Sequence, residues 1–558
     1  MIQISQLKLQ IPHTEEQLEE KIKKVLGIRK TDLLSFRILK RSLDARKKPV
    51  LFYVYTVEAE VKREKALKHK IKNPNVLFRG PIADYKIIPC GEQSLRERPV
   101  IIGSGPAGLF CTYALAKMGY RPLLLERGEA VDVRVKDVED FWKNGKLKSN
   151  SNVQFGEGGA GTFSDGKLNT LVHDKEGRGR EVLEVFVKHG APEQILYDNK
   201  PHIGTDILVD VVKNMRASIE KSGGEVRFHT KVSAVNFEEK DGEKALVSLE
   251  IQDTHTNEIS VIPTELAVLA IGHSARDTFH MLHEKEIPME AKSFAVGVRA
   301  EHLQTMIDES QYGSARKNSL PAAAYKLTAK LENGRGVYTF CMCPGGYVVN
   351  ASSEEGRIAV NGMSYSGRDG KNANSAVIVT VTPEDFGTED VLAGVAFQQK
   401  LEEAAYHAGN GRIPVQLFGD FCQNKASSGA GAILPQIKGD ITWTNIRQIF
   451  PEVIADALEQ GILMFDRKLK GYADPDTVLS AVESRTSSPV RILRDQTMQS
   501  VVRGLYPCGE GAGYAGGITS ASMDGLKVAE SVSQKYAPFD KGLTYQENFN
   551  GITLYTFW

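Results

Sequence analysis

The first 95 residues show two hydrophobic periods in turn. A stretch in which every second residue is apolar predicts a strand, and apolar residues three or four apart predict a helix. Thr14, followed by glutamates, is typical of a helix start, and Gly27 is typical of a helix end. The order is strand, helix, strand, strand, at residues 2–11, 14–27, 33–43 and 50–61. This order predicts a small ferredoxin-like α+β module at residues 1–95.

From residue 98 the pattern becomes that of an α/β domain. A short apolar strand at 100–102, a helix-length segment at 105–119 and a second strand at 122–126 predict one β-α-β unit. Further predicted elements are a helix at 205–222, a strand at 225–237, a meander at 245–252 and 258–262 around Asp241-Gly242, and a strand at 266–271.

The α/β pattern stops and then resumes near the C-terminus. Residues 283–495 have mixed α+β character, whereas residues 504–532 again predict a strand, a turn and a helix. The predicted fold class is therefore α/β: a Rossmann-like domain in two parts, an inserted α+β cap or substrate domain, and the small N-terminal module. The predicted boundaries are 1–95 (module), 96–282 and 496–535 (Rossmann-like domain), 283–495 (insert) and 536–558 (an aromatic-rich tail that packs down).

The chain has no net charge, but its charges are unevenly distributed. Residues 1–90 contain 20 Lys and Arg against 10 Asp and Glu, with the densest basic run from Lys62 to Lys72. We interpret this run as a solvated helix face. A site for an acidic partner such as RNA is the alternative.

Cysteine usage and the N-terminus bear on the compartment. Six scattered cysteines do not form a disulfide framework and suit a reducing environment. The N-terminus lacks the basic-then-apolar pattern of a signal peptide, and no apolar run approaches the roughly 18 residues of a membrane span. We therefore expect a cytoplasmic protein without a membrane span, and the sequence leaves its oligomeric state open.

The first motif with chemical meaning is a GxGxxG that follows the strand at 100–102. Its glycines allow a tight turn, close approach of a pyrophosphate and close packing of helix on strand. The helix N-terminus presents free N–H groups to the phosphates, and Glu126 is placed to accept hydrogen bonds from the ribose. The predicted dinucleotide-binding residues are Gly103, Ser104, Gly105, Pro106, Ala107, Gly108, Glu126 and Arg127.

A second motif, near the C-terminus, favours FAD over NAD. Residues 504–513 begin as a strand and end in glycines, and a helix follows at 523–530. The motif resembles the C-terminal flavin motif of glutathione-reductase-type FAD proteins, in which an acid after the strand binds the ribityl hydroxyls. The resemblance also implies that backbone at a helix N-terminus faces the flavin and stabilises its reduced, anionic form. The implied flavin-side residues are Gly509, Glu510 (the acid), Gly516, Gly517 and Ile518.

Two strands and one loop between these motifs agree with the resemblance. The strand at 266–271 ends in Gly272, near the position of FAD in that family, and Val232 stands where backbone approaches the adenine. The loop at 154–167 is the most glycine-dense of the chain, and glycines let backbone lie against a flat ring. By position it resembles the loop that lies along the isoalloxazine, which implies cofactor contacts from Gly158, Gly159, Ala160 and Gly161.

The whole chain resembles one bacterial family. The N-terminal module, the loop GEGGAGTFSDGKL and the insert segments SFAVGVRAEH and YTFCMCPGG are similar to those of FAD-dependent dehydrogenases of largely unknown substrate, related to geranylgeranyl reductases. The resemblance implies FAD as cofactor and redox chemistry, but it names no substrate. No second GxGxxG lies between a strand and a helix, which favours transient docking of NAD(P)H as electron donor, or another electron partner.

The motifs do not identify catalytic residues. Cys341 and Cys343 are candidates for a redox pair, because residues i and i+2 of a strand face the same side; two buried small hydrophobic residues are the more frequent arrangement. His273 is a candidate proton donor, and Arg299 and Arg368 are candidates for binding an anion or forming ordinary ion pairs. No metal-ligand spacing stands out.

The favoured function is that of an FAD-dependent oxidoreductase. It would transfer hydride between the flavin and a small organic substrate held between the FAD domain and the insert. Two alternatives stay open: an RNA-directed flavoenzyme that uses the basic module, and a non-catalytic flavin redox sensor.

Overall fold

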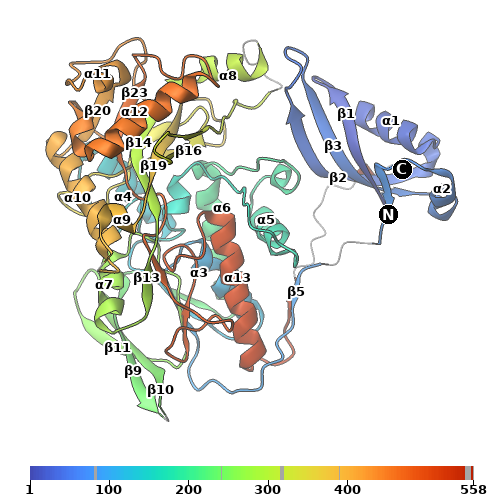
Figure 1. Ribbon diagram of the computed structural model, residues 1–558. Coiled ribbons are helices and arrows are strands. Elements are labelled where there is room, and N and C mark those ends of the chain that lie inside the picture. The colour runs from blue at the N-terminus through green and yellow to red at the C-terminus, as the bar shows by residue number, and fades with distance from the viewer. Residues whose placement is uncertain (81–83, 241, 314–319, 389, 547–554, 557–558) are drawn as a thin grey trace.

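The N-terminal module is an antiparallel sheet with two helices, seen in blue in Figure 1. The computed structural model describes residues 1–80, 84–240, 242–313, 320–388, 390–546 and 555–556. The elements of the module are β1 (Ile2–Gln10), α1 (Glu15–Leu26), β2 (Leu33–Asp44), β3 (Phe52–Val61), α2 (Glu64–Lys70) and β4 (Val76–Phe78). Thr14 caps α1 as predicted, since its hydroxyl accepts the N–H of Gln17 and its own N–H donates to the Gln17 side chain. The strand order β4-β1-β3-β2 confirms the ferredoxin-like plait.

A five-stranded parallel sheet is the centre of the Rossmann-like domain. Its strands, in spatial order, are β25 (Leu505–Pro507), β12 (Ala267–Leu269), β6 (Val100–Ile102), β7 (Leu123–Leu125) and β8 (Glu225–Arg227). Strand β12 pairs with β6 on one side and with β25 on the other. Segments that precede and follow the insert therefore share one sheet, which confirms the predicted Rossmann-like fold.

Helices pack on this sheet and on one another. They are α3 (Pro106–Lys117), α4 (Val131–Asn144), α5 (Arg178–Lys188), α6 (Thr205–Lys221) and α13 (Ile518–Lys535). Of these, α3 and α6 contact the strands of the sheet directly. Helices α3 and α13 lie side by side, and a Cβ added at Gly525 of α13 would stand 2.2 Å from the Ala107 carbonyl oxygen. Only a glycine permits so close an approach of two helix backbones.

The strand predicted at 225–237 is two strands. Residues of β8 complete the parallel sheet, whereas β9 (Thr230–Lys240) forms a three-stranded antiparallel meander with β10 (Glu243–Asp253) and β11 (Ile259–Pro263). The chain turns between the two sheets at His229, which has a φ of +55°. The propensities of both stretches are those of strands, so the change of sheet leaves little trace in the hydrophobic pattern. Asp241, in the predicted turn, lies outside the described residues.

The insert is built on a seven-stranded sheet. Its spatial order is β15 (Thr328–Lys330), β16 (Gly336–Cys343), β19 (Asn372–Val381), β14 (Phe294–Leu303), β23 (Val478–Glu483), β20 (Ile413–Leu417) and β22 (Ile441–Trp443). A small sheet of β17 (Tyr347–Asn350), β18 (Val360–Met363) and β21 (Ile437–Lys438) lies beside it. The helices of the insert are α8 (Gln304–Tyr312), α9 (Pro383–Phe386), α10 (Ala393–Ala408), α11 (Phe418–Cys422) and α12 (Glu452–Asp466).

A buried cluster of ion pairs joins the insert to the Rossmann-like domain. Arg276 of α7 (Arg276–Glu284) and Arg485 both donate to the fully buried carboxylate of Glu402 in α10, at 2.8 Å from each guanidinium. Arg485 also donates to Ser274 Oγ at 3.2 Å, and Arg276 to Glu354 at 2.8 Å. Because buried charges require partners, this cluster fixes how the two units meet.

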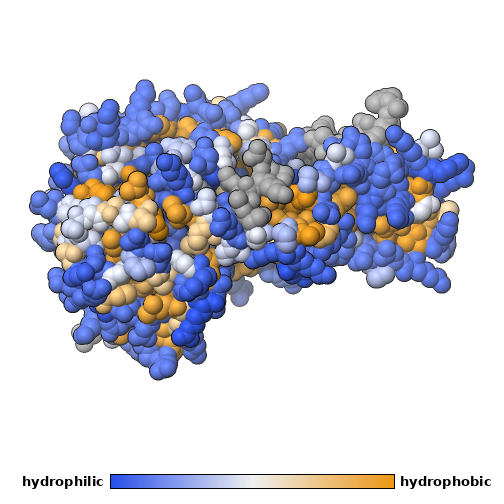
Figure 2. Space-filling view, turned by 90° about the horizontal axis from the view of Figure 1, so that it is seen from above, coloured by the Kyte–Doolittle hydropathy of each residue, from blue (hydrophilic) through white to orange (hydrophobic). Residues whose placement is uncertain are grey.

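The module projects from one side of the body, and hydrophilic residues cover most of its outline (Figure 2). It contacts the body through Arg41, which forms a bidentate ion pair with Asp198 at 2.7 and 3.0 Å. The basic run from Lys62 to Lys72 lies on and around α2, which has no buried residue. This exposure agrees with the interpretation of the run as a solvated helix face. Among the helices that the structure describes, none is both long and apolar enough to cross a bilayer.

Three short two-stranded or edge pairings complete the chain. They involve β5 (Lys86–Ile87) with β26 (Tyr545–Gln546), β13 (Met289–Ala291) with β24 (Val490–Ile492), and β27 (Tyr555–Thr556) with β2. Tyr545 is fully buried and its hydroxyl donates to Glu181 at 2.5 Å. Tyr545, near the start of the predicted C-terminal tail, therefore packs against the body.

Candidate functional site

The GxGxxG segment forms the predicted turn between β6 and α3. Gly103 has a φ of +98°, which favours glycine, and a Cβ there would lie 2.7 Å from the Ala270 carbonyl oxygen. A Cβ at Gly108 would lie 1.9 Å from the carbonyl oxygen of Gly103, so the helix packs directly on the turn. Gly105 is the N-cap of α3 and Pro106 its first residue. The N-terminus of α3 thus opens toward the place predicted for the pyrophosphate.

Glu126 holds two segments of the site together. One carboxylate oxygen accepts the N–H and the hydroxyl of Ser104, at 2.9 and 2.6 Å. The other accepts the N–H groups of Gly128 and Gly156, at 3.0 and 3.1 Å. The side chain is nearly buried. Glu126 therefore ties the GxGxxG turn to the glycine-dense loop, and its predicted contact with the ribose stays a prediction.

Arg134 holds the glycine-dense loop in place through hydrogen bonds from its guanidinium group. Its side chain is fully buried on α4, and burial lowers its pKa to about 10. The guanidinium donates to the backbone carbonyls of Asn152, Val153, Gly156, Glu157 and Gly159, at 2.7–3.2 Å. None of the sequence motifs includes this residue. The sequence does contain a sign of its role. Arg134 lies on the same face of α4 as the buried residues Val131, Val138 and Phe141, where an apolar residue would be expected.

Three glycine-bearing segments converge above α3. The N–H of Gly158 donates to the Ser104 carbonyl at 2.9 Å, and a Cβ at Gly159 would lie 3.0 Å from Gly105 Cα. A Cβ at Gly161 would lie 3.0 Å from the Ile518 side chain. Pro106, Gly158, Gly161 and Ile518 line a small shared cavity of about 20 Å³. The predicted pyrophosphate turn, flavin loop and flavin-side helix thus meet at one place.

The N-terminus of α13, which is predicted to face the flavin, is accessible to a ligand. Gly516 and Gly517 are exposed, and an added Cβ at Gly516 would meet no described atom within 4 Å. The preceding turn is held by Asp524, which accepts the N–H of Gly509 at 2.8 Å and pairs with Arg494 at 2.7 Å. Arg494 and Asp524 form a second support of the site, and neither belongs to a motif of the sequence.

The remaining predicted cofactor residues lie around these segments. Ala160 opens a short 3-10 turn at Ala160–Phe163, and Gly272 is exposed at the end of β12. Val232 is buried in β9 opposite Ile251. Arg127 forms a bidentate pair with Asp277 of α7, at 3.1 Å for both bonds, and its guanidinium lies over Phe155. The cradle of bare glycine backbone, with a helix N-terminus at each end, fits a dinucleotide with a flat ring.

The glycine-dense loop continues into a charged cluster shared with the insert. Asp165 is buried and pairs with Arg368 at 2.7 Å and with Lys167 at 3.4 Å. Burial alone would raise the pKa of Asp165, but Lys167 and Arg368 lower it below its ordinary value. Ser364 Oγ also donates to Asp165, and Lys167 Nζ donates to the carbonyl of Met342. Cluster residues from both units therefore meet next to the loop predicted to face the flavin.

His202 adds an unsatisfied group to this cluster. Burial and the positive charge of Arg368 lower the pKa of its imidazole to about 4, so the ring is neutral at pH 7. Among the described residues, no atom lies in good hydrogen-bonding geometry with either ring nitrogen of His202 or with Nε of Arg368, although backbone groups of Asp165 and Tyr365 lie near enough to the ring to oppose the lowering of its pKa. Buried polar atoms in proteins are nearly always paired, so these atoms are available to a ligand.

Comparisons with known proteins agree with the site. A family profile described as "FAD-dependent protein, C-terminal domain-like" matches residues 293–486, and an NAD(P)-binding Rossmann-like profile matches residues 101–156. A domain of unknown function matches residues 1–60. An uncharacterized protein of Clostridium beijerinckii is 46% identical over 540 residues, which make up 96% of this chain and 99% of that protein. The chain belongs to this family of FAD-dependent proteins.

Solved structures resemble this FAD-dependent protein only distantly. Glycerol-3-phosphate dehydrogenase from Bacillus halodurans, complexed with FAD, is 12% identical with a TM-score of 0.33, over 79% of this chain and 65% of that one. A geranylgeranyl bacteriochlorophyll reductase-like protein from Thermoplasma acidophilum is 11% identical with a TM-score of 0.33, over 79% of each chain. Values this low carry no argument about substrate. The family profiles and the fold identify the cofactor as FAD and the protein as of the FAD-dependent oxidoreductase type.

The two candidate cysteines of the FAD-dependent protein do not lie in a regular strand. The register of β16 against β19 shifts between Phe340 and Cys343, and Cys341 has a φ of +40°. This bulge removes the simple i, i+2 alternation on which the redox-pair hypothesis depended. Both cysteines are free thiols, and burial raises the pKa of Cys341 to about 12 and of Cys343 to about 11.

Arg299 and His273 occupy different surroundings. Arg299 is fully buried and bonds to Glu483 at 2.8 Å, to Asn374 and Asn361 at 2.9 Å, and to the carbonyl of Cys341 at 2.9 Å. Arg299 and Glu483 therefore form a buried structural ion pair within the insert. His273 lies after β12, with Nδ1 3.6 Å from Glu510 Oε1, and its buried Nε2 has no partner within the described residues. The structure thus brings His273 to the predicted flavin side of the FAD-dependent protein.

Proposed function

We propose that this protein transfers a hydride between FAD and a small anionic organic substrate held between the Rossmann-like domain and the insert. Bound FAD supplies a two-electron hydride acceptor or donor. The observation that carries the proposal is the closure of the insert over the glycine-dense loop. Trp142 Nε1 donates to the Asn350 carbonyl at 2.9 Å, and Gln154 Nε2 donates to the Ala351 carbonyl at 3.2 Å.

This closure supports a substrate site rather than a bare cofactor site. The insert contacts the glycine-dense loop on both sides of residues 158–161, at Gln154 and at Asp165 and Lys167. A ring held by residues 158–161 would therefore lie close to the insert, which would help to exclude water from the place of transfer. The contacts at the end of the loop are the hydrogen bond from Lys167 to Met342 and the ion pair between Asp165 and Arg368. Ligands of multi-domain enzymes bind preferentially at such domain interfaces.

The charge of the cluster indicates the substrate class. Lys167 and Arg368 carry two positive charges against the single negative charge of Asp165, and His202 is neutral. The net positive charge favours an anion. Arg368, whose φ is +46°, has a planar guanidinium suited to a carboxylate. Its strained backbone is typical of residues held for binding.

His273 is the residue that we assign to proton transfer. Oxidation of a C–H bond removes one hydride and one proton, so a base must stand near the ring to take the proton. The unpartnered Nε2 of His273 and its position beside Glu510 suit this role. In the reverse direction the same imidazole returns the proton.

The experiment uses the purified, FAD-loaded protein under anaerobic conditions. We expect the oxidised flavin spectrum to bleach with members of a panel of small hydroxy-, amino- or saturated carboxylic acids, but not with the matching amides or esters. NADPH and NADH form a separate arm, which tests for a transient nicotinamide donor. The proposal of an anionic substrate fails if neutral analogues react as fast as the acids.

Two variants separate binding from chemistry. Lys167→Met should raise KM for the acid about tenfold or more with a smaller change in kcat, because it removes one charge from the binding cluster. His273→Gln should lower kcat with a smaller change in KM, because it removes the group assigned to proton transfer. Lys175→Met removes an exposed lysine outside the cluster and should change neither. A flavin that no acid, amide or nicotinamide reduces would contradict turnover itself.

A further inference from the structure

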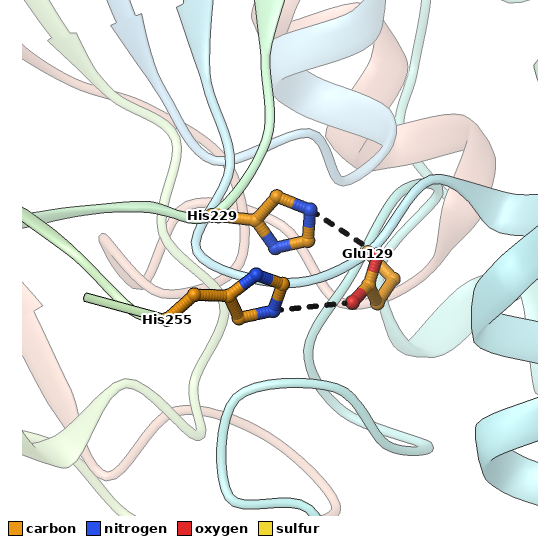
Figure 3. Close-up of side chains that lie close together, drawn as sticks. All are labelled: Glu129, His229 and His255. Carbon is orange, nitrogen blue, oxygen red and sulfur yellow. Dashed lines mark ion pairs between the residues drawn. The ribbon is translucent and has the colours of Figure 1, made fainter.

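Three side chains lie close together beyond the C-terminal end of β7. None of them has a role in the proposed redox function. Glu129 precedes α4, His229 lies at the corner between β8 and β9, and His255 lies in the turn between β10 and β11. Figure 3 shows both imidazoles directed at the Glu129 carboxylate. His229 Nε2 lies 3.3 Å from one carboxylate oxygen, and His255 Nε2 lies 3.4 Å from the other.

The ligand atoms have the chemistry and spacing of a metal site. One donor atom from each residue falls within 4.8 Å of the others. A tetrahedral zinc ion with bonds of roughly 2.0–2.1 Å to nitrogen and oxygen separates its donors by roughly 3.3 Å. Each imidazole nitrogen lies about one such edge from a different oxygen of Glu129, so a small rotation of the carboxylate and of the exposed His255 ring would bring one donor of each residue to a single ion. Two imidazoles and one carboxylate form a donor set that zinc accepts, with the fourth position left to water.

Ion pairing alone accounts poorly for this arrangement. The two imidazole rings are 3.9 Å apart between centroids and are tilted by 32°. Glu129 carries a single negative charge, so it can offset the charge of one cationic partner only, yet two rings are directed at it. A divalent cation instead binds two neutral imidazoles through their lone pairs and pairs with the carboxylate.

The backbone holds each ligand in place. The N–H of His229 donates to the Gly128 carbonyl at 3.3 Å, and its own carbonyl accepts the N–H of Thr254 at 2.8 Å. The Glu129 carbonyl accepts the N–H of Glu157 at 3.0 Å, and the N–H of His255 donates to Asp253 at 2.8 Å. The left-handed backbone of His229 is uncommon for a residue other than glycine. Strain of this kind is concentrated at functional sites.

We propose that Glu129, His229 and His255 form a binding site for one divalent transition-metal ion, zinc in the first place. The ion would connect three segments that are remote in sequence and that surround the predicted adenosine end of the FAD site. Exposure of the His255 side chain leaves a path from solvent and room for the ring to adjust. The site acts as a clamp on the fold and takes no part in hydride transfer.

The test measures zinc binding to the full-length, FAD-loaded protein after treatment with a chelator. We expect one equivalent of zinc by competition with a chromophoric chelator, and a higher unfolding temperature with zinc than without. Cobalt(II) should give tetrahedral ligand-field bands at wavelengths longer than the flavin absorption.

Variants decide whether these three residues hold the ion. Glu129→Gln and the double change His229→Asn with His255→Asn should each weaken zinc binding at least a hundredfold while FAD stays bound. The matched control removes His280 and His283, two exposed histidines on α7. The control should bind zinc as the parent protein does. Zinc binding that survives the site variants, or that the control abolishes, would overturn the proposal, as would the absence of binding in the parent protein. Neither outcome touches the proposed redox function, which is read from the flavin spectrum.

Discussion

Glu126 shows how one charged side chain can set the geometry of a cofactor site. Its two oxygens accept four hydrogen bonds, which join the GxGxxG turn to the glycine-dense loop. Glu126→Gln would place an amide NH₂ against backbone N–H donors. We expect a loss of about 2–3 kcal/mol in the free energy of unfolding, since bonds to a charged acceptor are lost. FAD affinity should fall at least tenfold, as measured by quenching of flavin fluorescence.

The exposed Glu139 of α4 provides the control for this change. Glu139→Gln removes the same charge from the same region but no hydrogen bond of the site. Its FAD affinity and unfolding free energy should match those of the parent protein. Equal effects of both changes would show that Glu126 acts only through net charge.

His202 gives the stability of the protein a pH dependence of known sign. Burial and Arg368 lower its pKa to about 4, against an ordinary value of 6.5. The unfolded chain therefore binds more protons between these values, so stability is complete above pH 6.5 and falls as the pH drops toward 4. His202→Gln removes this sensitivity. The difference in unfolding free energy between parent and variant should shrink by about 2 kcal/mol from neutral pH to about pH 5.

Chemical denaturation at several pH values measures this difference. The exposed His173 supplies the control: its change to Gln should leave the difference from the parent protein constant over the same range. A constant difference for His202→Gln as well would show that His202 is charged or solvated in the folded protein.

At the scale of elements, the turn between β6 and α3 requires a glycine at position 108. A Cβ at Gly108 would lie 1.9 Å from the Gly103 carbonyl oxygen, which is backbone and cannot swing away. Gly108→Ala should therefore push α3 away from the turn, cost about 1–3 kcal/mol of stability and reduce the FAD content of the purified protein. Gly429→Ala, at a position with no described atom within 4 Å of the new Cβ, should change neither quantity. Flavin absorbance per chain is the measurement.

The sequence predicts those elements whose structure is determined by neighbouring residues of the chain. It does not predict features that arise from contacts between segments remote in sequence. Thr14, Gly27 and the GxGxxG turn encode their structure within a few residues, so the module and the β-α-β unit were predicted correctly. The change of sheet at His229 and the bulge at Cys341 arise from neighbouring strands, and strand propensity alone does not show them. Arg134 and Asp524 support the site from buried positions, where a charged residue in an apolar period was the only available sign.

At the scale of the whole molecule, Glu402 holds the two large units together. It is fully buried and accepts bonds from Arg276 of one unit and Arg485 of the insert. Glu402→Gln leaves two buried guanidinium groups with only the less buried Glu354 as a counter-charge, at 2.8 Å from Arg276 and 3.8 Å from Arg485. Breaking a buried pair in this way costs about 3–5 kcal/mol. We expect calorimetry to show a lower first transition, in which the insert separates from the FAD domain.

The neighbouring Glu403 is the control for this change. It is exposed and pairs with Arg357 at 2.7 Å, so Glu403→Gln should shift the transition by less than about 1 kcal/mol. A single unchanged transition in Glu402→Gln would mean that apolar contacts alone hold the interface.

The pairing of β12 with β25 has a consequence for the way the protein is made. A ribosome releases β6, β7 and β12 long before it reaches Leu505–Pro507, because the whole insert is synthesised in between. Domains generally fold as their chain emerges, so the insert can mature first, while the edge of the parallel sheet beside β12 waits uncovered. Ile518 and the glycines before it are synthesised later still. Flavin can therefore be captured only at the end of synthesis, and a nascent chain stalled before residue 505 would carry none.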